Sequence, residues 1–202
     1  MRTLIMVDIQ NDFVAGGSLE VPFGEQIVPL VNGLSEKFDL VVATQDWHPS
    51  KHKSFASSHQ GKHPFEKIML GGLEQVLWPD HCVQGTPGAD FHSDLMMNRV
   101  EAIFRKGMDA GIDSYSGFYD NGHKKSTGLA GYLKERAVTS VYVCGLAADY
   151  CVYFTAKDAL QEGFETFVIG DATRAIDNNN FEKVKRDLRK LGGEIIDSHG
   201  LL

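Results

Sequence analysis

Cys151 has the setting of a candidate nucleophile. It follows Ser140–Cys144, an apolar and β-branched run that predicts a buried parallel strand. Gly145 ends that run, Asp149 stands where a helix N-cap is expected, and Tyr150–Gln161 has helical spacing. In the first turn of such a helix, unpaired N–H groups and the helix dipole favour a thiolate and could hold an oxyanion. On this stretch alone, an inert buried thiol remains the alternative.

Asp8 and Lys106 could complete a catalytic group with Cys151. Asp8 ends the predicted strand Thr3–Val7, and Lys106 follows the predicted strand Glu101–Arg105. A carboxylate near a thiol can take its proton, and an ammonium stabilises the thiolate while keeping the carboxylate ionised. Taken singly, a loop-capping aspartate and a solvated lysine are the alternatives.

Asp46 and His48 form a D-x-H pair, whose side chains face the same side of an extended backbone. His81 could supply a third metal ligand. Three ligands leave coordination positions open, as in reactive sites, and a mixed N/O set suits Zn²⁺, Fe²⁺ or Mn²⁺ without choosing among them. Such a site would hold one divalent metal ion, although this pattern alone favours metal binding no more than its absence. The remaining histidines, His52 among them, are expected mostly at the surface.

Alternating strands and helices indicate how these residues are positioned. Helices are expected over 24–37, 129–136, 150–161 and 181–191, and strands over 3–7, 40–44, 101–105, 140–144, 166–169 and 194–196. This alternation predicts an α/β fold, a doubly wound parallel six-stranded sheet with helices on both faces. Ligands of such sheets bind at the carboxyl ends of the strands, where Asp8, Asp46, Lys106 and Cys151 are expected. Asp171 also follows a strand, but loop ends are commonly polar.

The region around 45–98 is rich in His, Gly, Pro and Ser and has little periodicity. Long loops inside a compact domain are functional or disordered, and the histidines and aromatic residues favour function. No internal repeat or linker divides the sequence. Residues 1–202 are therefore expected to form a single domain, with 45–98 as a metal-site loop region.

Charge and cysteine content narrow the class of protein. A net charge of −7 without a basic run argues against nucleic acid or an anionic membrane surface as partner. No apolar stretch has membrane-spanning length, and the first residues lack a signal-peptide cleavage pattern. The three cysteines, Cys82, Cys144 and Cys151, cannot all pair, which favours a reducing, cytoplasmic location.

Six blocks follow one another in order over almost the whole chain. They are V-D-I-Q-N-D-F-V-A-G-G-S-L (7–19), T-Q-D-W-H-P-S-K-H-K-S-F-A (44–56), W-P-D-H-C-V-Q-G-T-P-G-A (78–89), R-K-G (105–107), D-S-Y-S-G-F-Y-D-N (113–121) and C-G-L-A-A-D-Y-C-V (144–152). Together they resemble the bacterial nicotinamidases/pyrazinamidases of the isochorismatase-like cysteine hydrolase superfamily. The D-W-H and W-P-x-H-C-V blocks are typical of its metal-binding members.

The resemblance implies roles for individual residues. It places the catalytic triad on Asp8, Lys106 and Cys151, and the oxyanion hole on the N–H groups of Ala147 and Cys151. The Ala147 N–H would be turned toward the oxyanion by a cis peptide bond between Leu146 and Ala147. The resemblance also implies that the metal ligands are Asp46, His48 and His81. It places Ser54 where some members of the family hold a metal-bound water. The aromatic ring of the substrate would lie between Phe13, Trp78 and Tyr115.

The implied activity is hydrolysis of nicotinamide to nicotinate and ammonia through a cysteine thioester, with pyrazinamide as a second substrate, in NAD recycling. One departure is Ala148, where the family usually has threonine. The lost hydroxyl performs no chemistry, so activity is expected to survive. An isochorismatase or carbamoyl amidase is the alternative enzyme, and a redox-sensing module using Cys151 is the non-catalytic alternative. The sequence leaves the oligomeric state open, including a homo-oligomer.

Overall fold

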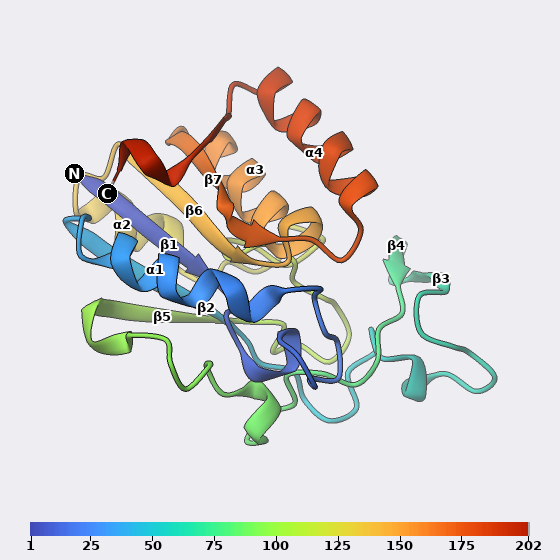
Figure 1. The fold of residues 1–202 in the computed structure, drawn as a ribbon. Coiled ribbons are helices and arrows are strands. Elements are labelled where there is room, and N and C mark those ends of the chain that lie inside the picture. Colours follow the sequence, from blue (N-terminus) through green and yellow to red (C-terminus); the bar gives the residue numbers. More distant parts are fainter. Residues whose placement is uncertain (202) are drawn as a thin grey trace.

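A parallel six-stranded sheet lies at the centre of the computed structural model, which describes residues 1–201 (Figure 1). Its strand order is β5–β2–β1–β6–β7–β8. The strands are β1 (Arg2–Val7), β2 (Leu40–Asp46), β5 (Val100–Lys106), β6 (Ser140–Leu146), β7 (Glu165–Arg174) and β8 (Glu194–Ile196). The chain winds outward from β1 in one direction and then, from β6, in the other. The predicted doubly wound parallel sheet is therefore confirmed, and all six expected strands are present.

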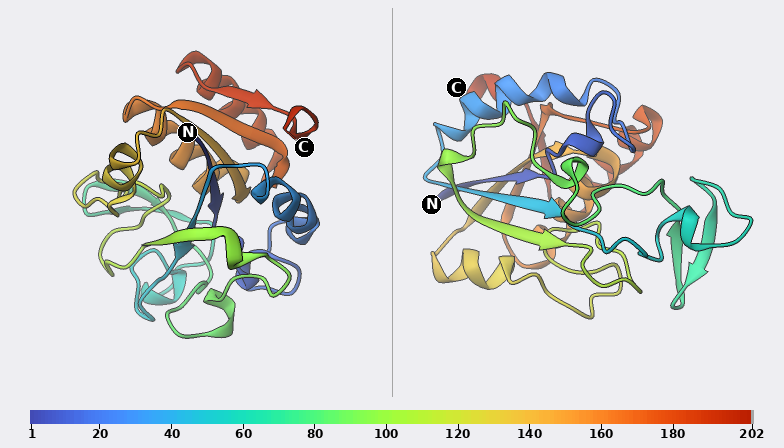
Figure 2. Two further views of the ribbon diagram at one scale, coloured as in Figure 1. Left: turned by 90° about the vertical axis from the view of Figure 1, so that its left-hand side faces the viewer. Right: turned by 90° about the horizontal axis from the view of Figure 1, so that it is seen from below.

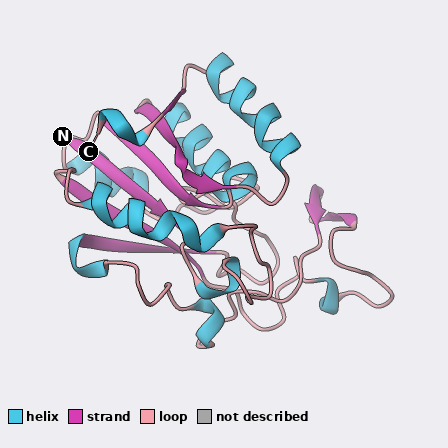
Figure 3. Ribbon diagram, viewed as in Figure 1, coloured by secondary structure: helices cyan, strands magenta, loops and turns pink. Residues whose placement is uncertain are grey.

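Helices cover both faces of the sheet, as predicted (Figures 2 and 3). Alternate residues of β1 divide between two cores: Leu4 belongs to the core under α1 (Val28–Ser35), and Ile5 to the opposite core. The second core is formed with the helices α2 (Leu129–Glu135), α3 (Tyr153–Gln161) and α4 (Asn178–Lys190). β1 is thus buried on both faces, which accounts for its continuous apolar sequence. None of the helices in residues 1–201 combines the length and apolar character needed to cross a membrane.

Two helix starts differ from the sequence-based expectation. The helix that carries Cys151 opens with one π-helical turn, Ala148–Val152, before α3 begins. Asp149 is not its N-cap, because the Asp149 carboxylate accepts the backbone N–H groups of Ile176 and Asp177, each at 3.0 Å. α4 begins earlier than expected because the Asp177 carboxylate caps it, accepting the N–H of Asn179 at 2.8 Å.

The long connection between β2 and β5 is ordered and contains a β-hairpin that the sequence reading missed. Its strands, β3 (Lys67–Leu70) and β4 (Leu73–Val76), are antiparallel and project from the body of the molecule (Figures 1 and 2). The turn is Gly71-Gly72, and both glycines have positive φ, of 58° and 89°. A Gly-Gly pair between two short runs is a recognised hairpin signal, so the sequence did contain a clue.

Gln10 joins this connection to the sheet. Its side-chain amide donates to the backbone oxygens of Asp46 and Ala89, both at 2.8 Å, and accepts the Asp46 N–H at 2.8 Å. Gln10 is fully buried, so these bonds are shielded from water. The backbone at the end of β2 is thereby fixed where the strand leaves the sheet.

Candidate active site

The ends of four strands bring Asp8, Lys106, Cys151 and Asp46 together. The Nζ of Lys106 lies 2.8 Å from Asp8 Oδ2, 3.1 Å from Asp46 Oδ1 and 3.4 Å from Cys151 Sγ. Lys106 and Asp46 are register partners in the neighbouring strands β5 and β2, which explains their proximity. The structure therefore assembles the residues that the sequence suggested as a triad and places one metal-ligand candidate beside them.

Backbone geometry at the junction of β1 and β6 makes this approach possible. Gly145 pairs with Val7, and a Cβ at position 145 would lie 2.1 Å from the Val7 carbonyl oxygen. Only glycine permits that contact, and its φ of 116° also favours glycine. Asp8 follows Val7 with a φ of 47°, which turns its side chain out of the strand pattern. The two loops that carry Asp8 and Cys151 consequently meet at the point where the strand order reverses.

Burial and neighbouring charges determine the protonation of the three residues. Burial raises the pKa of the Cys151 thiol well above its usual range, although the Lys106 ammonium acts in the opposite direction. Burial alone would lower the pKa of Lys106, but the carboxylates of Asp46 and Asp8 hold it well above its usual range. The expectation that the helix start favours a thiolate at rest is therefore wrong. Cys151 therefore needs a base to remove its thiol proton, and the Asp8 carboxylate is bridged to it by Lys106, whose Nζ lies 2.8 Å from Asp8 Oδ2 and 3.4 Å from Cys151 Sγ.

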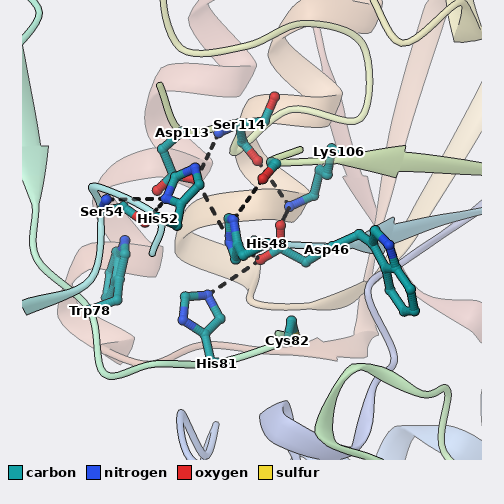
Figure 4. A network of polar contacts seen from close by, with 12 residues as sticks. Asp46, His48, His52, Ser54, Trp78, His81, Cys82, Lys106, Asp113 and Ser114 are labelled. Atoms are coloured by element: carbon teal, nitrogen blue, oxygen red, sulfur yellow. Dashed lines mark hydrogen bonds and ion pairs between the residues drawn. The ribbon is translucent and has the colours of Figure 1, made fainter. Parts of the chain in front are cut away.

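The proposed metal ligands meet beside Lys106 (Figure 4). His48 Nε2 and His81 Nε2 lie 3.0 Å and 3.3 Å from Asp46 Oδ2. The Nδ1–H of His48 donates to the Gly107 carbonyl at 2.9 Å, and that of His81 donates to the Pro79 carbonyl at 2.8 Å. Since a carbonyl can only accept, these bonds direct both Nε2 atoms toward Asp46, where each offers a lone pair to a metal once the imidazole is neutral. One carboxylate and two correctly oriented imidazoles fit a divalent metal ion.

Gly107 is required directly after Lys106 for steric reasons. Its φ is 67°, and a Cβ there would lie 2.4 Å from His48 Cε1 and 2.9 Å from Asp46 Oδ1. Any side chain would displace both proposed ligands. The sequence block R-K-G thus carries a steric requirement as well as the lysine.

One cavity borders both the thiol and the metal-ligand group. Cys151, Ala147, Asp46 and His81 all border it. The three predicted wall residues, Phe13, Trp78 and Tyr115, do line this cavity. Further walls that the sequence reading missed are Leu19, Asp113, Tyr150 and Ile176. The thiol and the metal-ligand residues therefore face the same cavity.

Comparisons with known proteins agree with this arrangement. The Isochorismatase domain model matches residues 2–200. The chain belongs to the isochorismatase family. It is 48% identical to a nicotinamidase of Acinetobacter baylyi, over 98% of this chain and 94% of the relative.

Solved structures of the isochorismatase family reproduce the whole fold. The nicotinamidase/pyrazinamidase of Acinetobacter baumanii superposes with a TM-score of 0.97 at 49% identity, over 100% of this chain and 98% of that one. The pyrazinamidase of Pyrococcus horikoshii in complex with zinc gives a TM-score of 0.80 at 38% identity, over 97% of this chain and 98% of that one.

The turn before Cys151 has the backbone conformation expected from the resemblance. The Leu146–Ala147 peptide bond is cis, as expected. Ala148 is buried, and the turn forms without a threonine hydroxyl at that position. The bonds from Asp149 to the Ile176 loop tie the turn to another wall of the cavity. The replacement of threonine by Ala148 therefore leaves the local structure complete.

Ser54 does not contact the proposed ligands directly but reaches them through His52. Its hydroxyl lies 2.7 Å from His52 Nδ1, and the His52 ring lies 4.3 Å from that of His48 (Figure 4). His52 is fully buried and is thus an exception among the further histidines, most of which were expected at the surface. Asp113 also adjoins the group, with Oδ1 3.9 Å from His48 Nε2. Its place at the start of the D-S-Y-S-G block was the only sequence signal for it.

Proposed function

We propose that this chain hydrolyses nicotinamide to nicotinate and ammonia, and pyrazinamide to pyrazinoate. The observation that carries the proposal is one cavity bordered both by Cys151 and by the metal-ligand residues Asp46 and His81. Phe13 and Trp78 give that cavity aromatic walls, which suit a flat heteroaromatic amide. The two Acinetobacter relatives, a nicotinamidase and a nicotinamidase/pyrazinamidase, support the same substrates.

In the proposed reaction, Asp8 takes the proton of the Cys151 thiol and the sulfur adds to the amide carbon. The backbone N–H groups of Ala147 and Cys151 hold the tetrahedral oxyanion. Asp8 then gives its proton to the departing ammonia, which leaves a thioester on Cys151. Asp8 next takes a proton from water, whose oxygen attacks the thioester, and the proton returns to the sulfur as nicotinate leaves. Lys106 stays positive throughout and balances the negative charge on Asp8 and on sulfur.

Asp46, His48 and His81 would hold one divalent ion, for which zinc, iron and manganese all suit the mixed donor set. An ion held by these residues would supply a Lewis acid for the ring nitrogen of the substrate. The residues around it then decide the orientation of the ring, because Phe13 and Trp78 restrict it to one plane. Ser54 could act through His52 on a metal-bound water. The pyrazinamidase of Pyrococcus horikoshii is in complex with zinc, which supports a metal ion as part of the proposed site.

The test is release of ammonia from nicotinamide, pyrazinamide and benzamide by the metal-loaded enzyme, with its metal content determined by elemental analysis. Benzamide has the same shape but no ring nitrogen. It should have a kcat/KM about thirty- to a thousandfold lower, since it leaves a buried partner unmatched. Turnover of benzamide as fast as nicotinamide would refute a metal anchor for the ring. Absence of turnover with all three amides would favour a carbamoyl amidase, an isochorismatase or a non-catalytic thiol module.

The proposed cellular role is recycling of nicotinamide toward NAD in the cytoplasm. The partner is then a small molecule, with no part for nucleic acid or membrane. A homo-oligomer is compatible with that role, and size-exclusion chromatography with light scattering would determine the oligomeric state.

A further inference from the structure

Thr44 holds the carboxylate of Asp8 at two points. It lies two residues before the end of β2 and is fully buried, as Asp8 is. Its hydroxyl donates to Asp8 Oδ1 at 2.6 Å, and its carbonyl oxygen accepts the Asp8 N–H at 3.3 Å. A short bond from a hydroxyl to a buried carboxylate oxygen stabilises the charged form and fixes the orientation of the group.

This bond makes the two oxygens of Asp8 inequivalent. Oδ1 is engaged by Thr44, whereas Oδ2 lies 2.8 Å from the Lys106 ammonium. Rotation of an aspartate carboxylate about its terminal bond is otherwise soft, so either oxygen could turn toward Lys106. With Thr44 in place, Oδ2 is the oxygen on the side of the ammonium, which itself lies 3.4 Å from Cys151 Sγ.

The position of the Thr44 hydroxyl is in turn set by Gly117. A Cβ at position 117 would lie 2.6 Å from the Thr44 methyl carbon, so the methyl packs directly against the glycine backbone. The φ of Gly117 lies outside the region that favours glycine, so the requirement at this position is steric. With its methyl group held against Gly117, Thr44 directs its hydroxyl at Asp8.

We propose that Thr44 is a positioning residue for the base: its hydroxyl orients Asp8 so that Oδ2 serves Cys151, and Gly117 holds that hydroxyl in place. The predicted effect of Thr44 on nicotinamide turnover rests on the proposed function, whereas its predicted effect on the reactivity of the Cys151 thiol does not. Thr44 touches neither the cavity nor the proposed metal ligands by any described side-chain contact, and it acts only through Asp8.

The first experiment compares Thr44→Val, Thr44→Ser and Thr3→Val in nicotinamide turnover. Thr44→Val keeps the shape but removes the hydroxyl, and kcat should fall about a hundredfold while KM stays nearly constant. Thr44→Ser keeps the hydroxyl and should retain most of kcat. Thr3→Val is the matched control, because Thr3 is a fully buried strand threonine whose hydroxyl has no hydrogen-bond partner within residues 1–201. It should leave kcat unchanged.

The second experiment uses the contact with Gly117. Gly117→Ala should push against the Thr44 methyl, turn the hydroxyl away from Asp8 and lower kcat as Thr44→Val does. Combining it with Thr44→Ser removes the methyl and should recover kcat. Failure of this recovery, or a Thr44→Val enzyme with the wild-type kcat, would overturn the proposal. So would a further large loss on adding Thr44→Val to Asp8→Asn, since Thr44 would then act on something other than Asp8.

Alkylation of Cys151 by iodoacetamide tests the positioning role of Thr44 without relying on the identity of the substrate. Thr44→Val should slow it about tenfold, whereas Thr44→Ser and Thr3→Val should not, because only the first weakens proton removal from the thiol. If the wild type released no ammonia from nicotinamide but alkylation followed this order, the proposed substrate would fail and the role of Thr44 would stand. Unchanged alkylation in Thr44→Val, with normal ammonia release by the wild type, would refute the role of Thr44 alone.

Discussion

At the scale of single residues, the three cysteines differ in access. Cys151 borders the cavity and is 7% exposed, whereas Cys82 and Cys144 are fully buried. Replacing Cys151 by Ala should reduce turnover to less than about one hundredth of wild type, because the thiol is the proposed nucleophile and the rest of the triad cannot replace it. Nicotinamide should still bind, as measured by calorimetry, since the walls and metal ligands remain. Substantial residual turnover would rule out a covalent route through this sulfur.

The protonation of Asp8 predicts the acidic side of the pH profile. The base works only when ionised, and burial raises the pKa of Asp8 above its usual value, although Lys106 opposes the rise. As the pH falls through this raised pKa, Asp8 gains a proton and kcat/KM falls. The acidic limb should therefore lie above the value of about 3.9 that is typical of a free aspartate.

The pKa of Lys106 is raised well above its usual range, so this ammonium should add no decline between neutral and mildly alkaline pH. The measurement is kcat/KM for nicotinamide against pH, with metal content checked at each pH to exclude loss of the ion. A profile that stays flat down to about pH 4 would show that no carboxylate with a raised pKa acts as the base.

At the scale of elements, the turn after β5 supports the metal-ligand group. Gly107→Ala would place a Cβ against His48 and would strain a backbone with positive φ. The Nδ1–H bond of His48 to position 107 should be lost, and metal affinity should fall about ten- to a hundredfold. Metal retained after dialysis against a weak chelator gives the measurement.

Gly111→Ala is the control for that change. It lies in the same loop, and a Cβ there would meet only the Asp109 carboxylate, at 3.5 Å. Equal metal retention in both variants would mean that Gly107 has no special role in holding His48.

The elements that were predicted correctly are those whose sequence pattern is local. The apolar runs identified the six strands, and the helical spacing identified α2 and α3 within a few residues. Short strands such as β3 and β4 carry too few residues for a periodic signal, so the hairpin was missed. Asp149 was misread because its partners, Ile176 and Asp177, come from a distant loop.

The same distinction applies to the candidate site. Motif blocks identified Asp8, Asp46, His48, His81, Lys106 and Cys151, and the structure brings them together. Ile176 and Tyr150 line the cavity because of tertiary contacts that no local sequence pattern encodes. The protonation of Cys151 was also beyond the sequence, since burial outweighs the helix-start effect only once the packing is known. The roles of these residues remain predictions for the experiments above.

At the scale of the whole molecule, a metal ion would cross-link the long connection between β2 and β5. Its proposed ligands come from the end of β2 and from His81 beyond the hairpin. A metal that binds only the folded chain stabilises it by about 2.7 kcal/mol at a hundred times its Kd. Removing it with a chelator should lower the Tm by about 5–10 °C in a chain of this size. A His81→Ala variant should show a much smaller shift, and an equal shift would place the stabilising metal elsewhere.

The three contacts of Lys106 have a consequence for how the protein can evolve. One ammonium balances a carboxylate of the metal-ligand group, Asp46, and the base beside the nucleophile, Asp8. A mutation that alters the charge on one side changes the field on the other, so substitutions at the two sides are not expected to be additive. A lineage that exchanges a metal ligand therefore has to readjust its acid–base chemistry as well. Such epistasis makes the loss of either half of the site difficult to reverse.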